Sequence, residues 1–234
     1  MLNNELLIVL STAIGIGILH TATGPDHYLP FIALAKARDW SLGKTIFWVL
    51  ACGCGHVWSS VLLGLGGVAL GWGVSKIEWI EGLRGGAAGW ALFLFGILYC
   101  SWGLLAAAKN KRHKHFDTYE NGDVYVFEHK HGQAVAAKDK HKVTPWVMFI
   151  IFLLGPCEPM IPLLFVPAAQ NSIWGMAILV TTYTLVTLAT MLLMVGLGFY
   201  GWSLFKTEKL ERYVHALGGF TILLCGTGMI FLGW

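Results

Sequence analysis

The stretch GILHTATGPDHYLPF, residues 17–31, places three ionisable side chains inside an otherwise apolar segment. They are His20 and the adjacent pair Asp26 and His27, which lie on either side of a Gly-Pro dipeptide. Proline has no backbone N–H and interrupts helical hydrogen bonding, so a helix through this stretch is expected to break there. An ionised side chain at the centre of a bilayer costs at least about 2.5–3.5 kcal/mol, and such side chains usually mark a functional site. The stretch therefore predicts a broken membrane helix with a binding site at the break.

The composition of the whole chain favours a membrane location. Of its 234 residues, 56% are hydrophobic and only 12% are charged, with a net charge of +3. A soluble domain of this length needs more charged surface, whereas this chain repeats apolar stretches of about 20 residues, the length that crosses a bilayer as a helix. The first stretch lacks the basic start and cleavage site of a signal peptide, so we interpret it as a retained span. We expect an all-α integral membrane protein that contacts the lipid bilayer and binds no nucleic acid.

Six transmembrane helices are expected, and one long polar segment separates the first three from the last three. The spans are placed at residues 5–35, 43–73, 85–108, 145–169, 172–204 and 212–234. The chain then divides into a first three-helix repeat at residues 1–108, a loop at residues 109–144 and a second three-helix repeat at residues 145–234. Within the loop, the sequence DVYVFEH indicates a short β-hairpin.

The basic residues predict the orientation of these spans. Of the 16 lysines and arginines, only Lys76 and Arg84 fall in the second and fourth connections, and the others fall in the first, third and fifth. Cytoplasmic loops carry an excess of lysine and arginine. We therefore expect an integral protein of a prokaryotic-type cell membrane, with both termini outside and the loop at residues 109–144 in the cytoplasm.

The Gly-Pro break occurs twice. GPDHYLPF at residues 24–31 and GPCEPMIP at residues 155–162 both begin with Gly-Pro, and each lies in the first span of a three-span half. Because three is an odd number, the two halves must insert with opposite orientations. Inverted repeats whose first helices are broken are typical of transport sites. The sequence therefore predicts two inverted three-helix repeats with broken first and fourth helices.

Further polar residues are expected at the depth of the first break. At about 1.5 Å per helical residue, His56 lies about 20 Å into its span, and Cys157 and Glu158 lie at a similar depth, near the middle of a core about 30 Å thick. Imidazole, carboxylate and thiolate groups together suit a borderline ion such as Ni²⁺, Co²⁺ or Zn²⁺ better than Mg²⁺ or Ca²⁺. The candidate metal ligands are His20, Asp26, His27, His56, Cys157 and Glu158.

Each kind of candidate also has a simpler interpretation. Asp26 can form a structural pair within the helical bundle, and His56 can bond a neighbouring carbonyl group. Cys157 can be an ordinary buried apolar residue, and Glu158 can accept a proton instead of binding metal. These alternatives stay open at the level of the sequence.

The break has a geometric consequence for a shared metal site. On a continuous helix, His20 and His27 are separated by about 10.5 Å along the axis. Two nitrogens that each lie about 2.1 Å from one ion cannot be so far apart. The two histidines can therefore bind the same ion only if the helix breaks between them, and on an unbroken helix they would mark successive stations along a path.

The motifs HTATGPDH and GCGHVWSS together resemble the nickel/cobalt transporter superfamily. The signature of that family is a histidine, a short spacer and Asp-His in one span, followed by Gly-His in the next. The spacer here has five residues, which is similar to the UreH-like branch of urease-accessory membrane proteins. The resemblance implies that His20, Asp26, His27 and His56 occupy metal-site positions. It implies a secondary transporter of Ni²⁺ or Co²⁺, with zinc and copper as further candidates, in which the ion is cargo and the protein is not an enzyme.

The second half favours an alternative function. GPCEPMIP is similar to the Pro-Cys motifs of CcdA/DsbD-type electron transporters, which are thought to share a distant inverted-repeat ancestry with this superfamily. A carrier of that kind exchanges disulfides and needs a partner thiol, but Asp26 stands at the position equivalent to Cys157, which leaves Cys52 or Cys54 as the partner. A third interpretation is an anion exporter that uses helix N-termini, although Asp26 and Glu158 would repel an anion.

Two further interactions are predicted outside the site. The tripeptide HKH occurs twice in the loop, and weak metal capture is expected there, while its lysines can equally meet anionic lipid. The loop histidines are His113, His115, His129, His131 and His141. The glycine-rich run at residues 64–73 permits close helix packing within one chain or between chains of a homo-oligomer.

Overall fold

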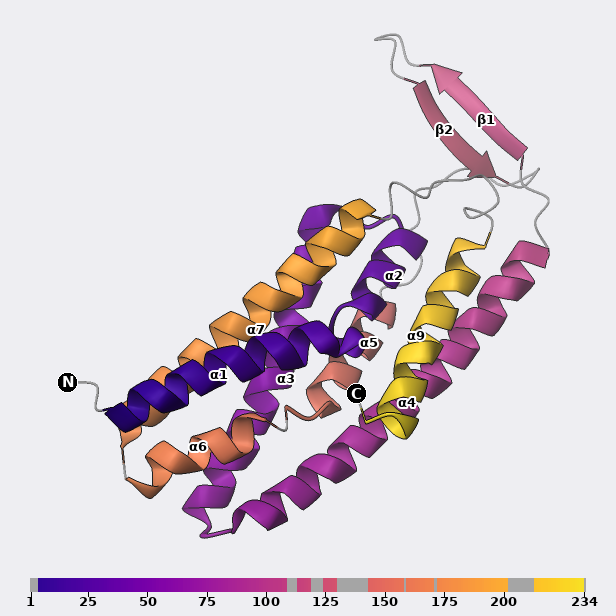
Figure 1. The fold of residues 1–234 in the computed structure, drawn as a ribbon. Helices are drawn as coiled ribbons and strands as arrows, with labels where there is room; N and C mark the ends of the chain where they lie inside the picture. The colour runs from indigo at the N-terminus through magenta and orange to yellow at the C-terminus, as the bar shows by residue number, and fades with distance from the viewer. Residues whose placement is uncertain are drawn as a thin grey trace.

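The computed structural model of the chain is built mainly from helices (Figure 1). It describes residues 4–108, 113–118, 124–129, 143–157, 159–170, 172–201 and 213–233. The first half contains helix α1 (Asn4–Thr23), the 3₁₀ helix η1 (Pro25–His27), and helices α2 (Leu29–Ala37), α3 (Leu42–Ala69) and α4 (Val74–Ala108). The second half contains α5 (Val143–Leu154), α6 (Met160–Ala169), α7 (Ile173–Gly201) and α9 (Val214–Phe231). Strands β1 (His113–Thr118) and β2 (Val124–His129) lie between the halves in sequence.

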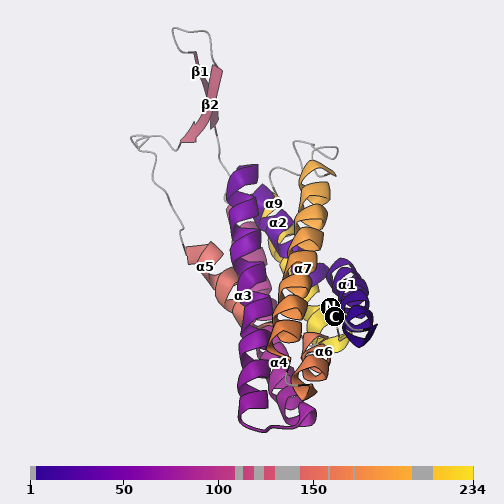
Figure 2. The same cartoon turned by 90° about the vertical axis from the view of Figure 1, so that its left-hand side faces the viewer.

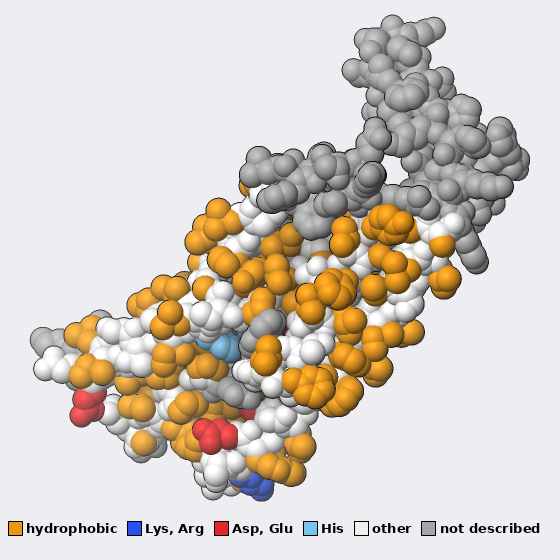
Figure 3. Space-filling view, turned by 45° about the vertical axis from the view of Figure 1, so that its right-hand side comes forward, with side chains coloured by type: hydrophobic (Ala, Val, Ile, Leu, Met, Phe, Trp, Pro, Cys, Tyr) orange, Lys and Arg blue, Asp and Glu red, His pale blue; other side chains and the backbone are white. Residues whose placement is uncertain are grey.

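The helices have the length and surface of membrane spans. Within the described residues, five helices are long and apolar enough to cross a membrane, namely α1, α3, α4, α7 and α9, while α5 and α6 are shorter apolar helices. Large hydrophobic side chains cover the outside of the bundle (Figure 3), and Trp174, for example, is 81% exposed. Such an extensive exposed apolar surface is typical of contact with lipid. The chain therefore has the character of an integral membrane protein.

Both Gly-Pro dipeptides interrupt a helix, as the sequence predicts. The segment expected as a first span at residues 5–35 is divided into α1 and α2, with η1 between them. The segment expected at residues 145–169 is divided into α5 and α6, and its non-helical part includes Gly155 and Pro156. Figure 1 shows α2 and α6 continuing in a new direction after each break.

The expected start of the third span at residue 85 is wrong. Helix α4 begins at Val74, so Lys76, Glu81 and Arg84 belong to the helix and not to a loop. The charges in this segment favoured a loop. Glu81 and Arg84 pair with each other one helical turn apart, which allows a helix to carry both charges.

Strands β1 and β2 form the expected hairpin. They pair antiparallel, with Thr118 opposite Val124 and His113 opposite His129. Figures 1 and 2 show the hairpin outside the helical bundle. The proposed metal capture by loop histidines also involves His131 and His141, which lie outside the described residues.

Helices α4 and α9 approach each other closely because glycines line their contact. A Cβ atom at Gly96 or Gly103 of α4 would overlap the backbone of α9, and one at Gly219 or Gly226 of α9 would overlap the backbone of α4. Small residues let membrane helices pack backbone to backbone, where van der Waals contact replaces the hydrophobic effect. The two long helices thus form one wall of the bundle (Figure 1).

Two buried apolar clusters divide the interior at one level of α3. The first cluster includes Val49 and Cys52 of α3, together with residues of α2, α5, α7 and α9. The second cluster includes Val57 and Val61 of α3, together with residues of α1, α6 and α7. His56 therefore lies at the junction of the two clusters, in the same part of the bundle as the helix breaks.

Candidate metal centre

The first break turns the chain locally without exposing its backbone. The N–H of Gly24 donates to the carbonyl oxygen of His20 at 2.9 Å and ends α1. Gly24 itself has an extended backbone conformation, with φ −87° and ψ 94°. The N–H of His27 then donates to the carbonyl oxygen of Gly24 at 3.1 Å, and that of Tyr28 donates to Pro25 at 3.3 Å. His20 at the end of α1 and His27 in η1 are thereby brought to the same level.

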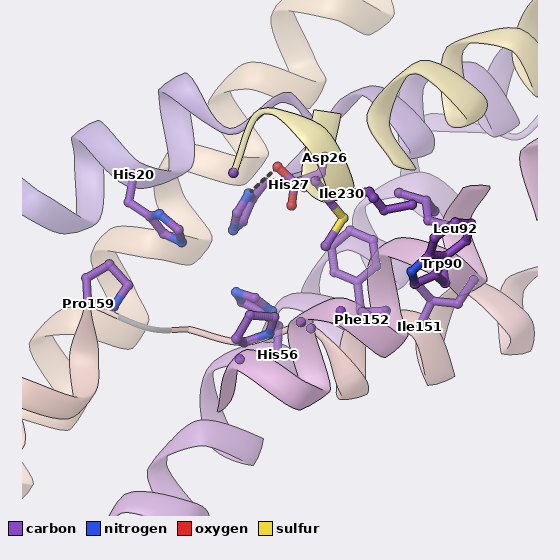
Figure 4. Close-up of a pocket in the computed structure, with 18 residues that line it drawn as sticks. His20, Asp26, His27, His56, Trp90, Leu92, Ile151, Phe152, Pro159 and Ile230 are labelled. Carbon is purple, nitrogen blue, oxygen red and sulfur yellow. Dashed lines mark hydrogen bonds and ion pairs between the residues drawn. The ribbon is translucent and has the colours of Figure 1, made fainter. Parts of the chain in front are cut away.

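Three imidazole rings converge at this level (Figure 4). The ring centroids of His20 and His27 are 4.8 Å apart, and those of His27 and His56 are 5.0 Å apart. One nitrogen from each ring lies within 4.8 Å of the other two. Two nitrogens bound at about 2.1 Å to one ion lie no more than about 4.2 Å apart. Small side-chain rotations are therefore enough to close the three rings around a single ion.

The converging rings present unpaired nitrogens. The Nε2 atoms of His20, His27 and His56 are all buried and make no hydrogen bond within the described part of the chain. The rings of His27 and His56 are almost completely buried, with 2% and 4% of each residue exposed. Leaving a buried polar atom unpaired costs about 1–3 kcal/mol. The three unpaired atoms form a candidate site for a group that accepts electron pairs, such as a metal ion.

Asp26 orients His27 from behind. Its Oδ1 lies 3.2 Å from Nδ1 of His27, and the carbonyl oxygen of Gly24 lies 3.2 Å from the same nitrogen. Both partners are acceptors, so Nδ1 carries the proton and Nε2 keeps a lone pair directed at the other rings. A carboxylate behind a histidine is the usual arrangement around a metal-binding imidazole, where it fixes the ring and raises its basicity. Asp26 thus contacts the site through His27, and its side chain also lines the adjoining cavity.

The second break forms a wall beside His56. A Cβ atom at Gly155 would lie 3.2 Å from Nδ1 of His56, so this glycine packs directly against the ring. The ring of Phe152, one turn earlier on α5, lies 6.2 Å from that of His56. The N–H of Gly155 donates to Ile151 at 2.9 Å and ends the helical ladder there. The site is therefore bounded by both breaks and by α3.

Cys157 does not belong to the converging set of donor atoms. Its side chain is fully buried in the second apolar cluster, and Sγ lies 3.5 Å from the hydroxyl oxygen of Tyr183. All five cysteines of the chain are described, and none of them forms a disulfide. Glu158 lies outside the described residues. The structure thus brings together His20, His27 and His56, with Asp26 behind them, and leaves Cys157 in an apolar environment.

A cavity of about 460 Å³ adjoins the three histidines. From the histidines it extends between α4 and the C-terminal end of α9, where its lining residues include Gly82, Gly85, Gly86, Met229, Ile230 and Gly233. A histidine side chain is visible at the surface among hydrophobic side chains (Figure 3). Phe152 also lines this cavity, and its ring packs against that of Phe31 with the centroids 4.7 Å apart. The site therefore adjoins an open space that is bordered by one ring of this aromatic pair.

Sequence reasoning missed a second polar cluster next to the site. Glu81 and Arg84 of α4 form an ion pair, and Ser59 and Ser60 of α3 are bonded to them. The signal that could have found the cluster was the spacing of an acid and a base three residues apart in a glycine-rich apolar segment, which suits one helix face. Because charged residues also suit a loop, the helical spacing of Glu81 and Arg84 was not recognised from the sequence.

The arrangement can bind a borderline divalent cation. Three neutral imidazoles with one carboxylate behind them suit Ni²⁺, Co²⁺, Zn²⁺ or Cu²⁺. Comparison of the chain with protein-family models, with curated proteins and with solved structures gave no match. The chemistry of this site is therefore the basis on which function is inferred.

Proposed function

We propose that this protein is a secondary transporter of a divalent transition-metal cation. The observation that carries the proposal is the convergence, beside a cavity, of three imidazole rings whose Nε2 atoms are buried and unpaired within the described part of the chain. Ni²⁺ and Co²⁺ are the favoured cargo, because the motifs around these histidines resemble the nickel/cobalt transporter superfamily. The ion is substrate, and no resident cofactor or catalytic reaction is involved.

In this proposal the three histidines are the protein ligands and Asp26 compensates charge. A divalent cation inside a bilayer needs negative charge nearby, since burying an isolated ion is very costly. Asp26 supplies one such charge through its contact with His27. Water from the cavity completes the coordination, and Glu158 is a further candidate from its position in the sequence. Cys157 is assigned to packing because its thiol lies against Tyr183 in an apolar cluster.

We further propose six membrane crossings arranged as two inverted three-helix units. In this arrangement the broken helix formed by α1 and α2 corresponds to the one formed by α5 and α6. Helix α3 corresponds to α7, and α4 corresponds to α9. The contacts between helices support the correspondence: α1 packs against α7 as α5 packs against α3, and α2 packs against α9 as α6 packs against α4. The corresponding helices α3 and α7 pack together, as do α4 and α9. Figure 2 shows α3 and α7 side by side.

Access to the site then alternates between the two ends of the bundle. The positive-inside rule favours an outside location for the beginning of α4 and the end of α9. Because residues at the end of α9 line the cavity, we assign its opening to that side. We assign the closure on the cytoplasmic side to the contact between Phe152, which lines the cavity, and Phe31 of α2. Rocking of one unit against the other would open this contact and close the cavity, as in other transporters built from repeats.

The alternative function is a thiol-disulfide electron carrier that uses Cys157. Such a carrier must bring two cysteines to within disulfide geometry, with Cα atoms no more than about 7 Å apart. Alkylation trapping that detects a redox-dependent disulfide between Cys157 and Cys52 or Cys54 would favour this function. We expect no such disulfide, because Cys157 packs in the second apolar cluster and Cys52 in the first.

Transport into proteoliposomes tests the proposal directly. Purified protein should catalyse uptake of Ni²⁺ or Co²⁺, and His27→Ala should reduce that uptake to the rate of empty vesicles while the protein stays inserted. His215→Ala is the matched control, since His215 contacts Tyr99 and Trp102 away from the site. Equal uptake by wild type and His27→Ala would contradict the proposed function.

A further inference from the structure

Helix α4 carries a buried ion pair inside the apolar part of the bundle. The side chain of Glu81 is completely buried, while that of Arg84 is 18% exposed. Arg84 donates from Nη1 to Oε1 of Glu81. An ion pair in this environment is usually no more stabilising than apolar residues of similar volume. The further contacts of the pair therefore indicate what it does.

Arg84 caps the end of the interrupted helix α5. Its Nη2 donates to the carbonyl oxygen of Leu153 at 2.8 Å and reaches that of Gly155 at 3.4 Å. The last carbonyls of a helix have no partner within the helix and carry the negative end of its dipole. A guanidinium group satisfies both the hydrogen bonds and the charge. The second break is therefore held by a side chain of α4.

Glu81 interacts with the opposite side of the same break through Ser60. The backbone N–H of Cys157 donates to Oγ of Ser60 at 2.9 Å, and the hydroxyl of Ser60 donates to Oε2 of Glu81 at 3.0 Å. The N–H group beyond the break is thereby connected to a carboxylate, just as the carbonyl groups before it are connected to a guanidinium. The positive member of the ion pair therefore meets carbonyl groups before the break, and the negative member meets an N–H group after it through Ser60.

The same network reaches the backbone of a proposed metal ligand. The hydroxyl of Ser59 donates to the carbonyl oxygen of His56 at 2.8 Å, and Nη2 of Arg84 donates to Oγ of Ser59 at 2.6 Å. One guanidinium group thus joins His56 on α3 to the segment at Gly155 that packs against the His56 ring. The position of this ring relative to His20 and His27 depends on that connection.

We propose that Glu81 and Arg84 are positioning residues of the metal site. They hold the second helix break and His56 together, so that the Nε2 atom of His56 meets those of His20 and His27. This inference rests on the proposed function, because it assigns the pair a role in metal binding. Neither residue contacts the ion.

Binding of Co²⁺ to the purified full chain tests the proposal, with the visible absorption of the bound ion as the signal. Arg84→Gln should weaken binding about 10- to 100-fold, the usual effect of removing a group that orients a metal ligand. Arg84→Lys should recover part of the affinity, since lysine keeps the charge but not the planar donor geometry. Lys76→Gln is the matched control, because Lys76 is a cation of the same helix that contacts Trp72 and not the site.

A double-mutant cycle separates positioning from a general structural effect. If Arg84 acts through His56, then Arg84→Gln should cause no further loss of Co²⁺ affinity in a His56→Ala background, whereas a general distortion would lower affinity in both backgrounds. Additive losses, or wild-type affinity in Arg84→Gln, would overturn the proposal. If Arg84→Gln fails to insert, Ser59→Ala keeps both charges and should weaken binding several-fold, and wild-type affinity in that variant would equally overturn it. Absence of Co²⁺ binding by the wild type would instead reject the proposed function, and this inference with it.

Discussion

Gly24 illustrates how a single residue controls the distance between two of the histidines. A Cβ atom at this position would lie 2.8 Å from Nδ1 of His27 and 3.0 Å from both Oδ1 of Asp26 and the carbonyl oxygen of His20. Nδ1 of His27 and Oδ1 of Asp26 are the two atoms of the contact that orients the His27 ring. No side chain fits there unless His27 and Asp26 move.

Gly24→Ala should therefore weaken metal binding without removing a ligand. We expect a loss of about 10- to 100-fold in Co²⁺ affinity, as for other changes behind a metal-binding histidine. Gly15→Ala is the control, because a Cβ at Gly15 of α1 meets no atom within 4 Å. Titration of both purified variants with Co²⁺ gives the comparison, and equal affinities would show that the Asp26–His27 contact does not control the site.

The candidate residues differ in how well the sequence alone predicts their roles. Ionisable residues in an apolar segment are conspicuous, so the amino-acid pattern is enough to select His20, His27 and His56 as candidates, and the structure brings these three side chains together. The orientation of a ring is not visible in a sequence, and the contact of Asp26 with Nδ1 of His27 depends on the local turn. Cys157 stands beside a break in sequence, but its side chain turns into an apolar cluster.

The helix break between α1 and α2 is the element on which the site depends. Pro25→Ala restores the backbone N–H and favours continuation of the helix by about 3 kcal/mol, the usual penalty of proline in a helix interior. A straighter segment would move His20 and His27 toward the spacing of about 10.5 Å expected on a continuous helix. We expect Pro25→Ala to bind Co²⁺ more weakly than the wild type, although every ligand is retained.

The control for this variant is Pro167→Ala, which removes a proline from within α6 and leaves the first break unchanged. Co²⁺ titration of the two variants compares the two prolines. Unchanged affinity in Pro25→Ala would mean that Gly24 and the surrounding packing maintain the break without the proline.

The helix breaks and the hairpin were predictable because a short sequence pattern indicates each of them. Gly-Pro dipeptides predicted both breaks, and alternating residues in DVYVFEH predicted the hairpin of β1 and β2. The start of α4 was not predictable from local charge, because Glu81 and Arg84 are accommodated by partners from α3 and α5. Tertiary contacts of this kind override the rule that charged segments form loops.

Transport by the intact protein should depend on pH through the histidines. A histidine binds metal only when it is neutral, so protons compete with the ion and binding releases them. With equal pH on both sides of a proteoliposome, initial Ni²⁺ uptake should fall as the pH is lowered from about 7.5 to about 5.5, across the histidine reference pKa of about 6.5. Uptake that stays constant over this range would argue against histidine ligands.

We propose that His20, His27 and His56 bind one metal ion together. X-ray absorption spectroscopy of the purified protein loaded with one equivalent of Ni²⁺ measures the ligand types and distances around that ion. We predict a shell of nitrogen and oxygen at about 2.0–2.1 Å with the outer-shell scattering of three imidazole rings, and no sulfur at about 2.3 Å. His56→Ala should remove one imidazole from the fitted number. A spectrum without imidazole scattering, or one dominated by sulfur, would contradict a metal site formed by the three histidines.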